Sequence, residues 1–220
     1  MVSLGPGDPS LVTLKALDTL KAVDAICIPT KSGDRSFTKS LSYRIVEELA
    51  SRYSLKARRV PIYAPMNYRE EDWREQAKEI AGCLDRYGET AFVTLGDAAI
   101  YSSVYYLLDI FERDYPELYE KCEVIAGVTS FSQASAKVKK PLCLGESALS
   151  IEPLPLRETQ RSRVYMRPWV GMPTGSIPES GELYRFENLD GEREKILPGR
   201  GDEIDSYMTL FIDFCRKREE

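Results

Sequence analysis

The chain has 220 residues, a formal net charge of −5 and no histidine. Its length allows one large domain or two smaller ones, with a core that needs no disulfide or metal. The mild negative charge argues against general binding to nucleic acid or to an anionic membrane. The absence of histidine excludes histidine-based triads, histidine-bound zinc and the commonest general base at neutral pH. We therefore predict no metal site and no nucleic-acid or membrane partner.

The five cysteines are scattered along the chain without a Cys-x-x-Cys pair. An odd number of cysteines, without a recognisable export signal, favours reduced thiols in a cytoplasmic protein. No apolar run approaches the ~20 residues that a membrane-spanning helix needs. Free cysteine usually serves as a small buried side chain, so we expect burial of all five. They are Cys27, Cys83, Cys122, Cys143 and Cys215.

The first residues predict a strand, a rigid turn and a helix. The apolar residues 2–4 lead into Gly-Pro-Gly-Asp-Pro at residues 5–9. Glycine permits positive φ and close approach of a ligand, while Pro6 stiffens the turn. Asp8 followed by Pro9 fits a helix N-cap and the first helical position. Such a corner suits the wall of a ligand cleft, although a plain connecting turn fits the same residues. The apolar face of the helix is expected to hold Leu11, Leu14, Leu17 and Leu20.

The following segments alternate between apolar strands and amphipathic helices. We expect strands at 25–28, 59–63, 90–95 and 123–126, with helices from about residues 37, 73 and 103 and another beyond residue 130. Pro61 restricts its strand to a sheet edge, because proline cannot donate a ladder hydrogen bond. The continuous apolar run at 90–95 is typical of a strand that a parallel sheet buries on both faces. This alternation indicates an α/β fold with a mainly parallel sheet and helices on both faces.

Three loops of small residues follow three of these strands, at residues 5–9, 96–101 and 127–130. The carboxyl ends of parallel strands meet at one edge of a sheet, and ligands bind outside that edge. We therefore expect the three loops to lie together and to line a ligand cleft.

The pattern changes in the last third of the chain. Short strands with proline-rich links replace the strand–helix alternation, which indicates a smaller domain of mixed α+β character. The proline-containing segment 153–160 suggests a linker. The strands are expected at 149–151, 163–166, 182–186 and 208–212.

Four segments together resemble the tetrapyrrole methyltransferase family, which uses S-adenosylmethionine. They are residues 5–9 with 14–16, residues 29–33, residues 96–103 and residues 127–132. The first and third are signatures of the whole family. The Pro-x-Lys-Ser-Gly and Thr-Ser-Phe-Ser sequences of the other two indicate the branch that methylates C-20 of precorrin-2 or cobalt-factor II. The resemblance covers nearly the whole chain, closely up to about Leu154 and loosely afterwards.

The resemblance implies a two-domain tetrapyrrole methylase fold, with residues 1–129 and 130–220 as the domains and the active-site cleft between them. It also implies a homodimer and methylation of the C-20 meso carbon in cobalamin (vitamin B12) biosynthesis. Lys31 and Arg35 are the expected cations for the carboxylates of the tetrapyrrole. The positions implied to bind S-adenosylmethionine are Pro6, Leu95, Gly96, Asp97, Ile100, Tyr101, Ser103, Thr129, Ser130 and Met166.

Several alternatives remain open at this point. Asp97 also fits a helix N-cap, and Met166 also fits an ordinary core position. No catalytic residue can be assigned, because uroporphyrinogen methyltransferases carry an aspartate where this chain has Pro29. Residues 167–181 are short and proline-rich, whereas the family has a longer helical segment there. The same fold also serves methyltransferases of RNA or of a modified protein residue, and a non-catalytic tetrapyrrole-binding module is the remaining hypothesis.

Overall fold

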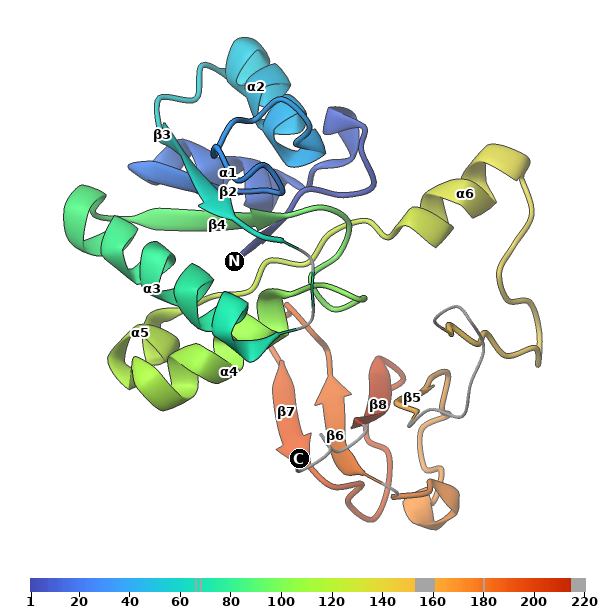
Figure 1. The fold of residues 1–220 in the computed structure, drawn as a ribbon. Coiled ribbons are helices and arrows are strands. Elements are labelled where there is room, and N and C mark those ends of the chain that lie inside the picture. Colours follow the sequence, from blue (N-terminus) through green and yellow to red (C-terminus); the bar gives the residue numbers. More distant parts are fainter. Residues whose placement is uncertain (66, 68, 153–160, 180, 215–220) are drawn as a thin grey trace. The chain divides into compact units, whose positions relative to one another are not determined.

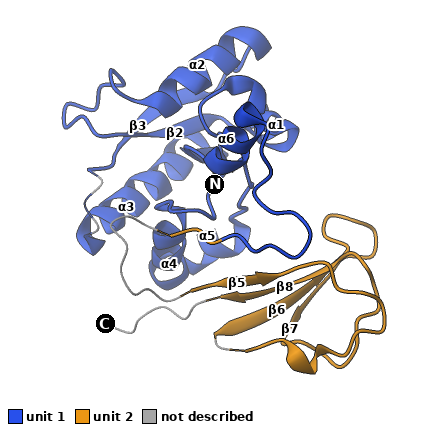
Figure 2. Cartoon of the chain, turned by 90° about the vertical axis from the view of Figure 1, so that its right-hand side faces the viewer, with its two compact units in different colours: residues 1–149 blue, residues 150–220 orange. Residues whose placement is uncertain are grey.

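The computed structural model describes residues 1–65, 67, 69–152, 161–179 and 181–214. The chain divides into two compact units, unit 1 (residues 1–149) and unit 2 (residues 150–220), which Figure 2 shows in different colours. The helix that starts at Ser130 belongs to unit 1. A domain boundary after residue 129 stays a prediction, and the linker expected at 153–160 lies outside the described residues.

Unit 1 contains a four-stranded, fully parallel sheet with the strand order β1-β4-β2-β3 (Figure 1). Its strands are β1 (Val2–Ser3), β2 (Ala25–Thr30), β3 (Arg58–Tyr63) and β4 (Thr90–Thr94). Strand β3 lies at the edge, as the proline in it predicts. The strand expected at 123–126 is reduced to a single parallel bridge between Ile125 and Val2.

Helices cover both faces of this sheet, as expected from the strand–helix alternation (Figure 1). In β2, Ile26 and Ile28 pack with residues of α1 and α2, whereas Cys27 packs with residues of α3 and α4. Successive side chains of a strand point to opposite faces of the sheet, so β2 contributes to the core on each face. The helices are α1 (Leu14–Ala22), α2 (Leu41–Tyr53), α3 (Glu70–Tyr87), α4 (Val104–Asp114), α5 (Pro116–Lys121) and α6 (Ser130–Val138).

The start of the first helix differs from the prediction. Asp8 caps a single 3₁₀ turn, Pro9–Leu11, and α1 begins separately at Leu14. The hydroxyl of Thr13 accepts a hydrogen bond from the Ala16 N–H at 3.2 Å, so this threonine is the N-cap of α1. As a result Leu14 sits in the first turn with 79% of its surface exposed, and only Ala16, Leu17 and Leu20 of α1 are buried. Similarly, Ser40 caps α2, which begins after the expected residue 37.

Unit 2 contains a four-stranded antiparallel sheet with the order β5-β8-β6-β7. Its strands are β5 (Arg163–Tyr165), β6 (Glu182–Glu187), β7 (Lys195–Pro198) and β8 (Thr209–Phe214), and a 3₁₀ turn spans Thr174–Ser176. Three of these strands match predicted ones, but β7 was not predicted and residues 149–151 form no strand. Among the residues of this unit that the structure describes, the buried apolar ones are Ile177, Leu183, Ile204 and Phe211.

The cysteines only partly follow the expectation of burial. Cys27 and Cys83 are buried, and burial raises the pKa of the Cys27 thiol, with a further contribution from Cys83. Cys122 is half-buried, whereas Cys143 is exposed, because residues 139–151 pack against no core. Cys215 lies outside the described residues. Within the described part of the chain, every helix is too short or too polar to cross a bilayer.

Candidate functional site

The loops after β1 and β4 are joined directly through two glycines. The Gly5 N–H donates to the Gly96 carbonyl at 3.1 Å, and the Gly96 N–H donates to the Gly5 carbonyl at 2.7 Å. Both residues have positive φ, 71° and 76°, a region that glycine enters without steric cost. The chain therefore turns at the same level in both loops, at the carboxyl edge of the sheet.

A third glycine closes this junction. A Cβ atom placed on Gly127 would lie 2.6 Å from the Ser3 Cβ and 2.8 Å from the Gly96 carbonyl oxygen. Only a residue without a side chain fits so close to two neighbouring backbones. The three loops predicted to converge thus meet in backbone contact, and we call Gly5, Gly96 and Gly127 the glycine junction.

The loop between β4 and α4 is held by short polar side chains. The Ser3 hydroxyl, buried in β1, accepts a hydrogen bond from the Ala98 N–H at 2.9 Å. The Asp97 carboxylate accepts from the Ala99 N–H at 3.1 Å, which stabilises the turn that leads to α4. At the end of the turn, Tyr101 adopts a positive φ of 51°. Asp97 therefore stabilises its own turn, but the N-cap position of α4 is Ser103, so the alternative interpretation of Asp97 as a helix N-cap is wrong.

The predicted cofactor-binding residues of unit 1 lie in the three loops that contain the junction glycines or at the starts of the helices that follow them. Leu95 and Tyr101 expose 42% and 66% of their surfaces. Thr129 caps α6 by accepting from the Ser132 N–H at 3.3 Å. Met166 belongs to unit 2, directly after β5, and is 67% exposed. The half-buried members of the set are Pro6, Gly96, Asp97, Ile100, Ser103 and Thr129.

Sequence reasoning missed two contributors to this site. Ser3 lies within an apolar run and was not predicted as a site residue, although a serine inside a buried strand indicates a polar contact. Tyr105, on the first turn of α4, has a pKa raised by its partial burial and by the nearby negative charge of Asp97. Its phenol therefore stays protonated at neutral pH and is available as a hydrogen-bond donor.

Hydrogen bonds lower the pKa of two loop carboxylates, Asp8 and Asp34, and so make them weaker bases. The pKa of Asp8 lies below its usual range, because its carboxylate accepts hydrogen bonds from the hydroxyl and the N–H of Ser10. The pKa of Asp34 is lowered in the same way by Ser36. Both groups hold turns in shape, and both have a reduced affinity for a proton.

The loop after β2 carries the two cations predicted to bind substrate. Lys31 is exposed and has no ion pair among the described residues. Arg35, in contrast, binds Glu79 of α3 through two hydrogen bonds, Nη1 to Oε2 and Nη2 to Oε1, both 2.6 Å long. Of the two predicted cations, Arg35 is therefore paired with a protein carboxylate, whereas Lys31 has no such partner among the described residues.

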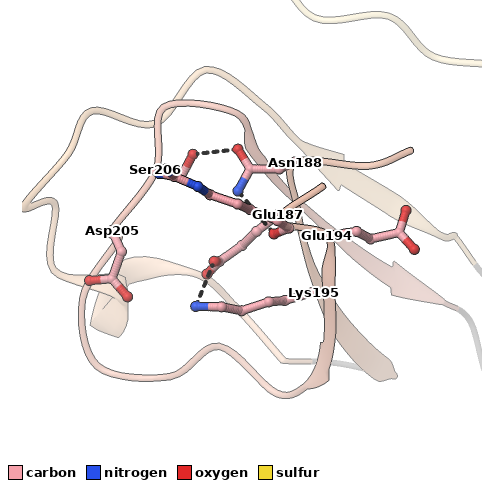
Figure 3. A pocket seen from close by; sticks show the side chains of 7 residues that line it. Glu187, Asn188, Glu194, Lys195, Asp205 and Ser206 are labelled. Atoms are coloured by element: carbon pink, nitrogen blue, oxygen red, sulfur yellow. Dashed lines mark hydrogen bonds and ion pairs between the residues drawn. The ribbon is translucent and has the colours of Figure 1, made fainter. Parts of the chain in front are cut away.

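A separate pocket of about 460 Å³ lies in unit 2 (Figure 3). Among its lining residues Glu187 pairs with Lys195 at 3.5 Å, and Glu187 also pairs with the neighbouring Arg185. The Ser206 hydroxyl donates to the Asn188 side-chain oxygen at 3.0 Å. The pocket contains none of the predicted site residues. It is lined by Glu187, Asn188, Arg193, Glu194, Lys195, Asp205 and Ser206.

A parallel α/β unit with glycines at its carboxyl edge, followed by a smaller antiparallel unit, defines a two-unit α/β protein. Its sequence matches the model of the Tetrapyrrole (Corrin/Porphyrin) Methylases over residues 1–180. The chain belongs to this family, as its four motifs predict, and it is a methyltransferase.

Relatives and solved structures agree with this assignment. The chain is 28% identical over 227 residues to a protein of Methanocaldococcus jannaschii named "Probable cobalt-precorrin-2 C(20)-methyltransferase", covering 96% of this chain and 93% of the relative. It is 31% identical over 153 residues to the cobalt-precorrin-2 C(20)-methyltransferase of Salmonella typhimurium, covering 68% and 60%.

Two solved structures show the same fold. One is a cobalamin synthesis related protein (CobF) from Corynebacterium diphtheriae, with a TM-score of 0.52, 16% identity and coverage of 96% of this chain and 95% of the other. The second is the cobalt precorrin-4 methyltransferase CbiF, with a TM-score of 0.50, 15% identity and coverage of 96% and 92%. At these identities the likeness concerns the fold alone.

Proposed function

We propose that this protein transfers a methyl group from S-adenosylmethionine to the C-20 meso carbon of precorrin-2 or cobalt-factor II, in cobalamin biosynthesis. The observation that carries the proposal is the similarity to the Methanocaldococcus jannaschii relative, which extends over 96% of this chain. The Pro-x-Lys-Ser-Gly sequence at residues 29–33 and the Thr-Ser-Phe-Ser sequence at 129–132 support the same branch of the family.

The glycine junction supports a site for S-adenosylmethionine. The glycines let the three loops pack closely at the carboxyl edge of the sheet, and the exposed Leu95 offers an apolar surface for an adenosine beside the half-buried Gly96. The cofactor supplies the methyl group and its positive sulfonium. The protein's task is to align donor and acceptor for an in-line displacement, and alignment alone lowers such barriers by about 7–11 kcal/mol. We propose contacts from Pro6, Leu95, Gly96, Asp97, Ile100, Tyr101, Ser103, Thr129, Ser130 and Met166.

Lys31 is the proposed contact for the substrate's carboxylates. Its ammonium is exposed in the loop after β2, whose carboxyl end lies at the same sheet edge as those of β1 and β4. Loss of the meso proton after methyl addition requires a base, and the lowered pKa values of Asp8 and Asp34 make them poor ones. By family resemblance we also propose a cytoplasmic homodimer.

The test is a methyl-transfer assay with purified protein, methyl-labelled S-adenosylmethionine and precorrin-2, supplied metal-free and cobalt-loaded. Mass spectrometry is expected to detect one added methyl group, and comparison of the two substrates identifies which one is used. Calorimetry is expected to detect binding of S-adenosylhomocysteine. No binding at millimolar concentration would contradict the proposed cofactor, and transfer to RNA instead of precorrin-2 would contradict the proposed acceptor.

A further inference from the structure

Residues 30–36 comprise the last residue of β2 and the first part of the connection to α2, and they have their own hydrogen bonds; we call this segment the Lys31 loop. The Thr30 hydroxyl donates to the Ser36 carbonyl at 2.6 Å and so ties the two ends of the loop together. Inside it, the Arg35 N–H donates to the Ser32 carbonyl at 2.9 Å. These bonds fix the shape of the loop but leave its orientation on the sheet to other contacts.

The Arg35 side chain attaches the second half of the Lys31 loop to α3 and β3. Its guanidinium makes the bidentate pair with Glu79 of α3 and also donates to the Pro61 carbonyl of β3 at 3.4 Å. Arg35 reaches these partners with a φ of 58°, a backbone conformation that costs a non-glycine residue free energy. The loop therefore holds a strained conformation that directs this side chain toward α3.

Glu79 is well placed to hold a neighbouring loop. Its side chain is 26% exposed, and its charge contributes to the raised pKa of the buried Cys27 thiol, after the larger effects of burial and Cys83. Glu79 thus lies on the inner side of α3, a rigid helix of 18 residues. A bidentate arginine–carboxylate pair fixes direction as well as distance, unlike a single contact to a lysine.

We propose that Arg35 and Glu79 form a clasp that orients the Lys31 loop and so places the Lys31 ammonium for the carboxylates of the substrate. Arg35 is then a positioning residue and makes no contact with the substrate itself. This inference rests on the proposed function for the role of Lys31, whereas the clasp itself is a property of the loop.

Two variants separate a clasp from a direct contact. In a clasp, Arg35→Gln and Glu79→Gln remove the same interaction, so each raises KM for the tetrapyrrole by about tenfold, as expected for one lost charged hydrogen bond, with kcat nearly unchanged. The double variant is no worse than either single one. If Arg35 contacts the substrate, Glu79→Gln releases the guanidinium and leaves KM at or below the wild-type value, which overturns the proposal.

The exchange variant, Arg35→Glu combined with Glu79→Arg, tests whether an ion pair of reversed charge restores KM. A clasp is restored by reversing both charges, so KM returns toward the wild-type value. Direct contact instead predicts that the exchanged glutamate repels the substrate and raises KM further than Arg35→Gln does. Glu75→Gln is the matched control, because Glu75 is exposed on the same helix one turn earlier.

A second readout does not depend on activity. A lysine-specific protease is expected to cleave after Lys31 faster in Arg35→Gln and in Glu79→Gln than in the wild type or in Glu75→Gln, as followed by mass spectrometry of the peptides. Equal cleavage rates overturn the clasp. If wild-type protein does not methylate precorrin-2, the proposed function fails by itself, and the cleavage rates still decide whether the clasp exists.

Discussion

Replacing Gly127 with alanine places a methyl group into the glycine junction. The new Cβ would lie 2.6 Å from the Ser3 Cβ and 2.8 Å from the Gly96 carbonyl oxygen. Ordinary contacts begin at 3.4 Å, so the loop after Ile125 must move by about 0.6 Å or more from a carbonyl that is itself hydrogen-bonded to Gly5.

Overpacking of this kind costs about 1–3 kcal/mol of folding free energy. For a chain of this size a loss of 2 kcal/mol lowers the melting temperature by about 4–8 °C. The displaced loop also carries Thr129 and borders Gly96, so affinity for S-adenosylhomocysteine should fall together with stability. The assays are thermal unfolding and calorimetry.

Gly82→Ala is the matched control, because it makes the same chemical change in the interior of α3 where no atom lies within 4 Å of the new Cβ. There alanine is expected to stabilise the helix by about 0.8–1 kcal/mol. If Gly127→Ala melts and binds S-adenosylhomocysteine as the wild type does, the three loops are not in backbone contact and the reasoning is refuted.

Three further substitutions address single interactions. Ser3→Ala removes the acceptor of the buried Ala98 N–H and should cost about 1–3 kcal/mol in chemical denaturation; a loss below half of that would indicate that another acceptor replaces it. Asp8 has a lowered pKa, so the stability that its charge contributes is present above its ordinary value of 3.8 and is lost as the pH falls through the lower folded-state value. The stability difference between wild type and Asp8→Asn should therefore shrink in acid, and a constant difference down to pH ~2 would contradict this sign. Arg185→Met leaves the buried Glu187 without its main partner and should destabilise the protein by about 3–5 kcal/mol, unless Lys195 compensates, in which case the measured loss stays small and the pair is not essential.

The sequence predicted best those features that a short run of residues determines by itself. A continuous apolar run such as β4 identifies a strand buried on both faces, and Gly96 after it indicates a turn at the carboxyl edge. Convergence of the three loops followed from parallel topology alone, before any contact was known.

The sequence did not predict features that depend on which of several candidate caps or contacts the folded structure selects. Both Asp8 and Thr13 are good N-caps, and only the three-dimensional context assigns the first to a 3₁₀ turn and the second to α1. Arg35 and Glu79 are separated in the chain by α2, β3 and the first half of α3, so no local spacing joins them. Strand β7 is exposed along its whole length and ends in proline, which removes the apolar pattern that would identify it.

Pro61 has a consequence for how this protein meets other chains. The N and C=O groups of one strand residue point to the same side, and at the open edge of β3 the nitrogen of Pro61 carries no hydrogen while its carbonyl receives the Arg35 guanidinium. An incoming strand therefore finds neither a donor nor an unused acceptor at this position. Natural sheets protect exposed edges in this manner against strand addition and aggregation. The contact that we propose to orient a loop thus also removes one pairing position from the open edge of the sheet of unit 1.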